Sequence, residues 1–283
     1  MGIGTDILAD WHASYAALQW LQELGAMDPA LDAPLDRYAL AERLPPAASA
    51  ASAAYSPAAP APVADSPAAR RPAAPPVTEA PVQVDPVAEA RGAARQADNL
   101  ATLREVMGAY PHCELKQGAR NTVFADGNPA ARVMIIGEAP GRDEDQQGLP
   151  FVGRAGQLLD RMLAAIGLDR ASPDAERAVY ITNVMPWRPP SNREPTAEEM
   201  AMMGPFLQRH VELAAPDVIV VMGNTPAQAV LGRRGITRLR GAWTEAWGHP
   251  VLPMLHPAYL LRNPAAKREA WADLLALQAR LRG

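Results

Sequence analysis

The sequence predicts an α/β fold, a three-layer α/β/α sandwich around a four-stranded parallel sheet. Four short apolar runs rich in β-branched residues alternate with stretches whose apolar residues recur at helical spacing. The runs are 133–136, 179–182, 218–222 and 251–255. Because strict alternation of strands and helices is typical of a parallel sheet covered on both faces, each run is predicted to be a buried strand.

A helix is predicted after each of these strands. The apolar residues of 158–166 follow a helical period. After the second strand, Thr196 and Glu199 form a T-x-x-E capping box, which predicts a helix start. After the third, Thr225 and Pro226 are predicted to be the N-cap and the first helical residue. Pro264 is predicted to open the last helix.

Two segments of different composition precede this region. Residues 1–43 are acidic and include an amphipathic pattern over Asp6–Gly25, which predicts a short helix. Between Leu44 and Ala88, 27 of 45 residues are Ala or Pro. This segment has too few large apolar side chains for their burial to offset the entropy lost on ordering the chain. We therefore predict a disordered linker over 44–91 and a folded domain over 92–283.

Composition limits the class of protein. No apolar run approaches the roughly 20 residues of a membrane span, and the start lacks a secretory pattern, so a cytoplasmic monomer without membrane contact is expected. The single cysteine excludes an intramolecular disulfide and a cysteine-cluster zinc site. The net charge of −4 divides into −5 for residues 1–45, −1 for 46–91 and +2 for the remainder. The acidity therefore lies outside the predicted domain.

Polar residues and glycines follow the predicted strands where each strand ends. They are Gly137 and Glu138, Asn183, Gly223 and Asn224, and His256. The carboxyl ends of parallel strands meet at one edge of the sheet, and ligands of open α/β sheets bind there. The sequence therefore predicts one composite site.

Four segments of the chain match a known family in order and spacing. GEAPGRDED, GLPFVGRAGQLL, TNVMPWRPPSNREP and HPAYLLRNP closely resemble the motifs of family 4 uracil-DNA glycosylases, the iron–sulfur type. The resemblance covers roughly Tyr110 to the C-terminus. It implies a monofunctional enzyme that binds uracil-containing DNA, flips the uracil out and hydrolyses its N-glycosidic bond.

The resemblance assigns expected roles to the site residues. Glu138 orders or polarises the attacking water, or binds the substrate through hydrogen bonds. Phe151 stacks on the flipped base. The Asn183 amide matches the O4 and N3–H edge of uracil, and cytosine presents the reverse pattern. His256 donates to uracil O2 as the bond breaks. The substrate-binding set also includes Gly137, Ala139, Gly223 and Asn224, whereas the acid cluster 143–145 is expected to be a solvated turn.

The HPAYLLRNP segment is the expected DNA contact. Leu260 and Leu261 resemble the apolar wedge that enters the minor groove and fills the gap left by the flipped nucleotide. Arg262, Lys267 and Arg268 are expected to hold phosphates.

The chain departs from the family pattern at the cluster. Family 4 enzymes bind an iron–sulfur cluster through four cysteines, and those positions hold Tyr110, Cys113, Trp187 and Met203 here. An iron–sulfur cluster needs thiolates, and one of four remains. We therefore expect neither cluster nor metal, with side-chain packing filling the volume and Cys113 unreactive.

Two alternatives remain open. The chain could be a DNA- or uracil-binding module without catalysis, or an interaction protein whose N-terminal helix binds another protein. A nucleotide-phosphate enzyme is less well supported, because the chain has neither a Walker lysine nor a G-x-G-x-x-G pattern.

Overall fold

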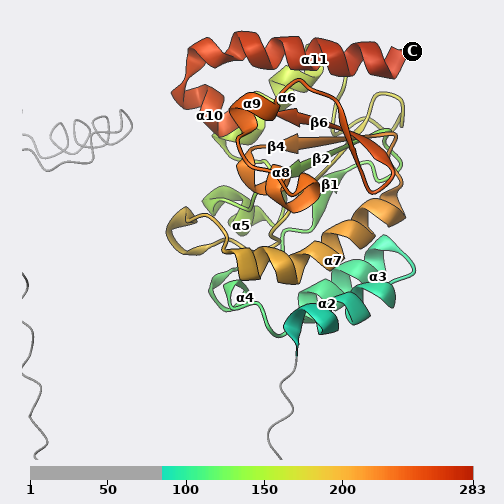
Figure 1. Ribbon diagram of the computed structural model, residues 1–283, viewed down its shortest axis with the longest axis vertical. Coiled ribbons are helices and arrows are strands. Elements are labelled where there is room, and N and C mark those ends of the chain that lie inside the picture. Colours follow the sequence, from blue (N-terminus) through green and yellow to red (C-terminus); the bar gives the residue numbers. More distant parts are fainter. Residues whose placement is uncertain (1–84, 283) are drawn as a thin grey trace, which may run out of the picture. The chain divides into compact units, whose positions relative to one another are not determined.

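A six-stranded sheet forms the centre of the part of the chain that the structure describes (Figure 1). The computed structural model describes residues 85–282, so the helix predicted over 6–25 and the linker up to residue 84 lie outside the described residues. The strand order is β1-β3-β2-β4-β6-β5. The strands are β1 (Ala125–Gly127), β2 (Val133–Gly137), β3 (Val179–Asn183), β4 (Val218–Met222), β5 (Thr244–Ala246) and β6 (His249–Met254).

The four predicted strands are present and parallel. They correspond to β2, β3, β4 and β6, and β2, β3 and β4 are buried along their whole length. Val133 pairs with both Val179 and Val218, so these strands start level. Gly137 pairs with Asn183 at the other end. The carboxyl ends of β2 and β3 are thereby fixed side by side.

The prediction of only four strands was incomplete. β1 and β5 extend the sheet at its two edges, each pairing antiparallel with its neighbour. Each is three residues long and only partly buried, so neither produces the apolar run or alternation that a sequence pattern can detect.

Helices cover both faces of the sheet, which confirms the predicted α/β sandwich (Figure 1). α6 (Arg154–Ala164) and α11 (Lys267–Arg282) lie on one face, where Leu159, Leu163 and Leu274 pack against β-strand side chains. α7 (Ala197–Ala214) and α8 (Asn224–Leu231) cover the other face. The remaining helices are α2 (Pro86–Arg95), α3 (Leu100–Ala109), α4 (Leu115–Gly118), α5 (Arg142–Gln147), α9 (Ile236–Leu239) and α10 (Pro257–Arg262), with 3₁₀ turns at Pro190–Asn192 and Pro264–Ala266.

The predicted linker ends too late. Asp85 caps α2 by accepting hydrogen bonds from the Val87 and Ala88 backbone N–H groups, and Ala90 and Ala94 are buried where α2 packs on α7. Alanine is an excellent helix former, so its abundance near residue 90 indicates a helix as well as a linker. The predicted boundary at residue 92 falls inside this helix.

Helix starts were predicted with mixed success. The capping box of Thr196 and Glu199 is confirmed at the start of α7. The N-cap of α8 is Gly223 at φ +105°, so the assignment of Thr225 as N-cap was wrong by two residues. Residues that have a side chain rarely adopt that φ, whereas glycine adopts it without strain. α11 begins at Lys267, after the short 3₁₀ turn that Pro264 opens.

Candidate active site

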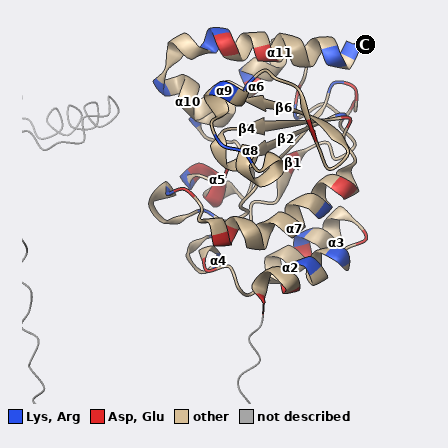
Figure 2. Ribbon diagram, in the orientation of Figure 1, with Lys and Arg blue, Asp and Glu red and all other residues tan. Residues whose placement is uncertain are grey.

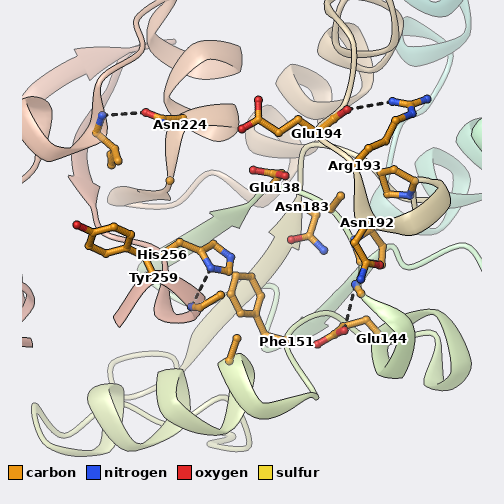
Figure 3. A pocket seen from close by; sticks show the side chains of 18 of the residues that line it. Glu138, Glu144, Phe151, Asn183, Asn192, Arg193, Glu194, Asn224, His256 and Tyr259 are labelled. Atoms are coloured by element: carbon orange, nitrogen blue, oxygen red, sulfur yellow. Dashed lines mark hydrogen bonds between the residues drawn. The ribbon is translucent and has the colours of Figure 1, made fainter. Parts of the chain in front are cut away.

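A pocket of about 510 Å³ opens at the carboxyl ends of the parallel strands (Figure 3). Segments that follow all four predicted strands contribute to its lining, as the sequence predicted. The predicted site residues in its lining are Glu138, Ala139, Phe151, Asn183, Gly223, Asn224 and His256. Glu138, Phe151, Asn183 and His256 point toward one shared space.

Gly137 supports the pocket from behind. A Cβ atom at this position would overlap Oδ1 of Asn183 and the ring of Phe151. The ring and the amide therefore lie directly against the backbone at the end of β2. Gly137 thus permits the close approach of two side chains that line the pocket.

Asn183 is the last residue of β3 and is 7% exposed. Its neighbour Thr182 anchors the strand end by donating from Oγ1 to the Phe124 carbonyl at 2.7 Å. A buried amide offers a donor and an acceptor in a fixed orientation. This side chain is therefore suited to reading the edge of a planar base.

His256 is held as a neutral imidazole. Burial lowers its pKa to about 4, with a smaller contribution from Arg262. Its Nδ1 accepts a hydrogen bond from the Ala258 backbone N–H at 3.1 Å, which caps α10. The proton of the neutral ring is therefore on Nε2, where it can be donated to a ligand. The ring stacks on Phe151, with centroids 5.4 Å apart.

Glu138 lies on the opposite side of the pocket from Phe151 in Figure 3. Its Oε2 accepts a hydrogen bond from Thr225 Oγ1 at 2.8 Å. Burial raises the pKa of the carboxyl, and the bond from Thr225 works against that rise. Thr225 was predicted only as a helix cap, and its contact with Glu138 has no signal in the sequence.

Two members of the acid cluster after β2, Glu144 and Asp145, are structural, so the prediction of a solvated turn was wrong for them, whereas Asp143 is exposed. Glu144 accepts from the backbone N–H groups of Gly141, Val152 and Gly153 at 2.9–3.1 Å. It thereby ties the turn after β2 to the turn that carries Phe151. Asp145 is buried and accepts from the N–H groups of Arg120 and Asn121.

Asn224 and Gly223 shape the pocket wall. Oδ1 of Asn224 accepts from the backbone N–H groups of Gly235 and Ile236 at 2.9–3.0 Å, so this oxygen is already engaged. A Cβ atom on Gly223 would contact His256 at 3.5 Å. Both residues therefore organise neighbouring backbone and side chains in addition to lining the pocket.

Of the two leucines of the expected apolar wedge, only one is exposed. Leu260 is fully buried among core residues, so it cannot enter a DNA groove in this conformation. Leu261 is 36% exposed beside it on α10. Arg262, Lys267 and Arg268 are exposed, and the ribbon of Figure 2 marks Lys and Arg positions on α10 and α11 in blue. The DNA-contact hypothesis thus keeps Leu261 and the three cations and loses Leu260.

The four positions of the family's cluster cysteines form part of one core, which we call the Trp187 region: Tyr110, Cys113, Trp187 and Met203. Each is 2% exposed or less. Tyr110 donates to the Pro86 carbonyl at 2.7 Å, and Trp187 Nε1 donates to Thr122 Oγ1 at 3.1 Å. Burial raises the pKa of the Cys113 thiol. This donor set does not fit an iron–sulfur cluster, which requires thiolates.

Residues 85–282 contain no group of three or more His, Cys, Asp or Glu side chains arranged to hold a metal ion. Within the same range, no helix is both long and apolar enough to cross a membrane.

Comparisons with known proteins agree with this geometry. The model of the uracil DNA glycosylase superfamily matches residues 124–275. The type-4 uracil-DNA glycosylase of Archaeoglobus fulgidus is 42% identical over 180 residues, which are 60% of this chain and 87% of that protein. The Thermotoga maritima type-4 enzyme is 44% identical over 155 residues, covering 53% and 77%. A Pyrobaculum aerophilum type-5 enzyme is 33% identical over 149 residues, covering 48% and 66%.

Proposed function

Because this chain belongs to the uracil-DNA glycosylase superfamily and its relatives include type-4 enzymes, we propose that it is a monofunctional uracil-DNA glycosylase of base excision repair. Its substrate is DNA that contains uracil. The reaction removes the base by hydrolysis and leaves the DNA strand intact. The observation that carries the proposal is the convergence of Glu138, Phe151, Asn183 and His256 on one pocket.

Base recognition rests on two side chains. Phe151 provides a ring face for the flipped uracil, an interaction of about 1 to 3 kcal/mol. Asn183 accepts from uracil N3–H through Oδ1 and donates to O4 through Nδ2. Cytosine presents an acceptor and a donor in the opposite order, so it is rejected with two unpaired polar groups.

Bond cleavage places negative charge on the base. As the bond between C1′ and N1 breaks, its electron pair moves onto the uracil ring, and the Nε2–H of neutral His256 donates to O2. A water oxygen then bonds to the electron-deficient C1′, and Glu138 accepts its proton or orients the water for attack. Both roles use the ionised form of Glu138.

Release of free uracil tests the proposal. A uracil-containing oligonucleotide should yield free uracil and an intact abasic strand, whereas the cytosine counterpart should not react. Tight binding of the oligonucleotide without uracil release would instead support the non-catalytic binding module.

The chain's lysines argue against a covalent lyase mechanism. Lys116 and Lys267 are the only two lysines, and neither lines the pocket. A lyase forms a Schiff base between an amine and the sugar. Borohydride treatment during the reaction should therefore trap no covalent adduct, and a trapped adduct would overturn the monofunctional assignment.

We also propose that the enzyme works without an iron–sulfur cluster. The support is the Trp187 region, whose residues supply one thiol and otherwise apolar packing or engaged hydrogen-bond donors. Protein purified anaerobically should be colourless and contain no stoichiometric iron. Stoichiometric iron with visible charge-transfer bands would refute this part of the proposal.

The remaining features of the proposal concern setting and partners. We propose a monomer that acts in the cytoplasm, since a pocket formed by one chain needs no second copy. An unidentified protein is the proposed partner of residues 1–43. Sedimentation of the purified chain at micromolar concentration should give the mass of a single copy.

A further inference from the structure

Phe151 has a backbone conformation that is unfavourable for its residue type. Its φ is +54°, in the left-handed region that favours glycine and strains a residue with a side chain. The residue is 5% exposed, and its ring lies between Gly137 and His256. Such a conformation persists only where surrounding contacts determine it.

Arg170 supplies those contacts from a loop beyond α6. Its Nη1 donates to the Pro150 carbonyl and its Nη2 donates to the Phe151 carbonyl, both at 2.9 Å. A guanidinium can hold two carbonyls at once because its donors lie in one rigid plane. The peptide groups on both sides of the Phe151 Cα are therefore hydrogen-bonded to a single side chain.

Two carboxylates fix the guanidinium in turn. Arg170 pairs with Asp126 of β1 at 3.1 Å and with Asp160 of α6 at 2.7 Å, and its side chain is 14% exposed. The edge strand β1 and the helix α6 thus determine where the guanidinium lies. Arg170 is at the centre of a network that ends on the backbone of the stacking residue.

Gly156 allows the Phe151 carbonyl to lie directly against the first turn of α6. A Cβ atom on this first-turn residue of α6 would overlap the Phe151 carbonyl. The carbonyl is therefore enclosed by the helix on one side and by Arg170 on the other. Fixing both peptide groups sets the direction of the Phe151 Cα–Cβ bond, and the contacts with Gly137 and His256 then hold the ring at the pocket.

We propose that Arg170 is a positioning residue for uracil excision, holding Phe151 in the conformation that presents its ring to the flipped base. The inference rests on the proposed glycosylase function, in which Phe151 stacks on uracil. Arg170 does not line the pocket and acts only through Phe151.

Arg132 offers a matched control. It also pairs with two carboxylates, Glu176 and Asp217, and donates to one carbonyl, that of Leu281. It directly precedes β2, at the amino-terminal ends of the strands, whereas the pocket lies at their carboxyl ends. Arg132→Gln therefore removes a similar network without touching the site.

Fluorine NMR tests the position of the ring independently of activity. The chain has three phenylalanines, so labelling with para-fluorophenylalanine gives three signals, and Phe151→Leu identifies one of them. In spectra recorded well below the melting temperature, Arg170→Gln should shift or broaden the Phe151 signal. Arg132→Gln should leave it unchanged.

Kinetics then test the consequence for the reaction. We expect Arg170→Gln to lower kcat/KM about 100-fold, the scale of a small misplacement of a reacting group, and Arg170→Lys to recover part of that loss. The inhibition constant of free uracil should rise in parallel, since the product also stacks on Phe151. Arg132→Gln should match the wild type in both measurements.

The outcomes separate the two levels of the inference. An unchanged Phe151 signal in Arg170→Gln refutes the positioning role, whether or not the protein is active. Wild-type kinetics in folded Arg170→Gln also refute it. A wild-type chain that releases no uracil refutes the proposed function instead, and the fluorine signals still report on Arg170.

Discussion

The pocket and the Trp187 region relate differently to the type-4 pattern. The pocket has the residues that the resemblance assigns to chemistry, including Glu138, Asn183 and His256. The Trp187 region has one of the four expected cysteines. A base-reading amide or a proton donor depends on specific atoms, whereas a structural core depends on filled volume and satisfied polar groups. Scaffold positions can therefore be rebuilt with other residue types, provided the packing closes.

The largest effect is expected from Trp187→Ala, because the comparison assigns this residue a packing role. Removing a fully buried indole should cost about 3 to 5 kcal/mol of the free energy of unfolding. Trp271→Ala is the control, since that side chain is 43% exposed. Denaturant unfolding measures both. Equal and small losses would show that the Trp187 region contributes little to stability.

His256→Ala tests the pocket directly. Loss of a donor that faces developing negative charge should lower kcat about 100- to 1,000-fold. His249→Ala removes the same residue type from the other end of β6 and should retain full activity. Comparable losses in the two variants would move the proton-donor role away from His256.

Asn183→Asp should reduce uracil excision by about 2 to 4 kcal/mol of transition-state stabilisation, because the carboxylate loses the donor and repels uracil O4. Asn224→Asp is the informative control. Its Oδ1 bonds to Gly235 and Ile236 are kept by a carboxylate, so a much smaller loss is expected. Single-turnover rates on uracil DNA give both values. A larger loss in Asn224→Asp would assign base reading to that residue.

Two histidines make stability depend on pH: His256 in the pocket, and His210, which stacks on the core residue Phe124. Burial lowers the pKa of His256 to about 4 and that of His210, which contacts Tyr180, to about 3. Since both ordinary values are near 6.5, the unfolded chain takes up protons first as pH falls. Each histidine should therefore remove about 1.4 kcal/mol per pH unit from roughly pH 6.5 down to its folded pKa.

Substitution separates these two contributions. The carboxyls of Glu138 and Asp273 have raised pKa values and act in the opposite direction, so differences between proteins are compared. In His210→Gln and His256→Gln, stability should fall less steeply as the pH is lowered. The slope of each should be smaller by the uptake of about one proton on unfolding. An unchanged slope in either variant would show that the histidine has the same pKa in the folded and the unfolded chain.

The sequence predicted the sheet and the site edge because buried parallel strands are continuous apolar runs with polar residues at their ends. It could not decide between Leu260 and Leu261, since adjacent helical residues point about 100° apart and the motif does not give the phase. The structural roles of Glu144 and Arg170 could not be predicted from the sequence for another reason. Their partners are backbone groups 3 to 20 residues away, which have no sequence signature.

The smallest effect is expected from removing residues 1–84. Every pocket residue and every contact of the Trp187 region described above lies within residues 85–282, so uracil release should stay at the wild-type rate. Removing residues 1–95 provides the contrast. That deletion takes away α2, which packs on α7, and the Pro86 carbonyl that Tyr110 binds, so thermal stability should fall markedly. The shorter deletion tests the N-terminal segment alone, whereas the longer one also disturbs the Trp187 region. If the shorter deletion alone abolished excision in a folded protein, residues 1–84 would have a direct part in catalysis, and the contrast between pocket and core would be incomplete.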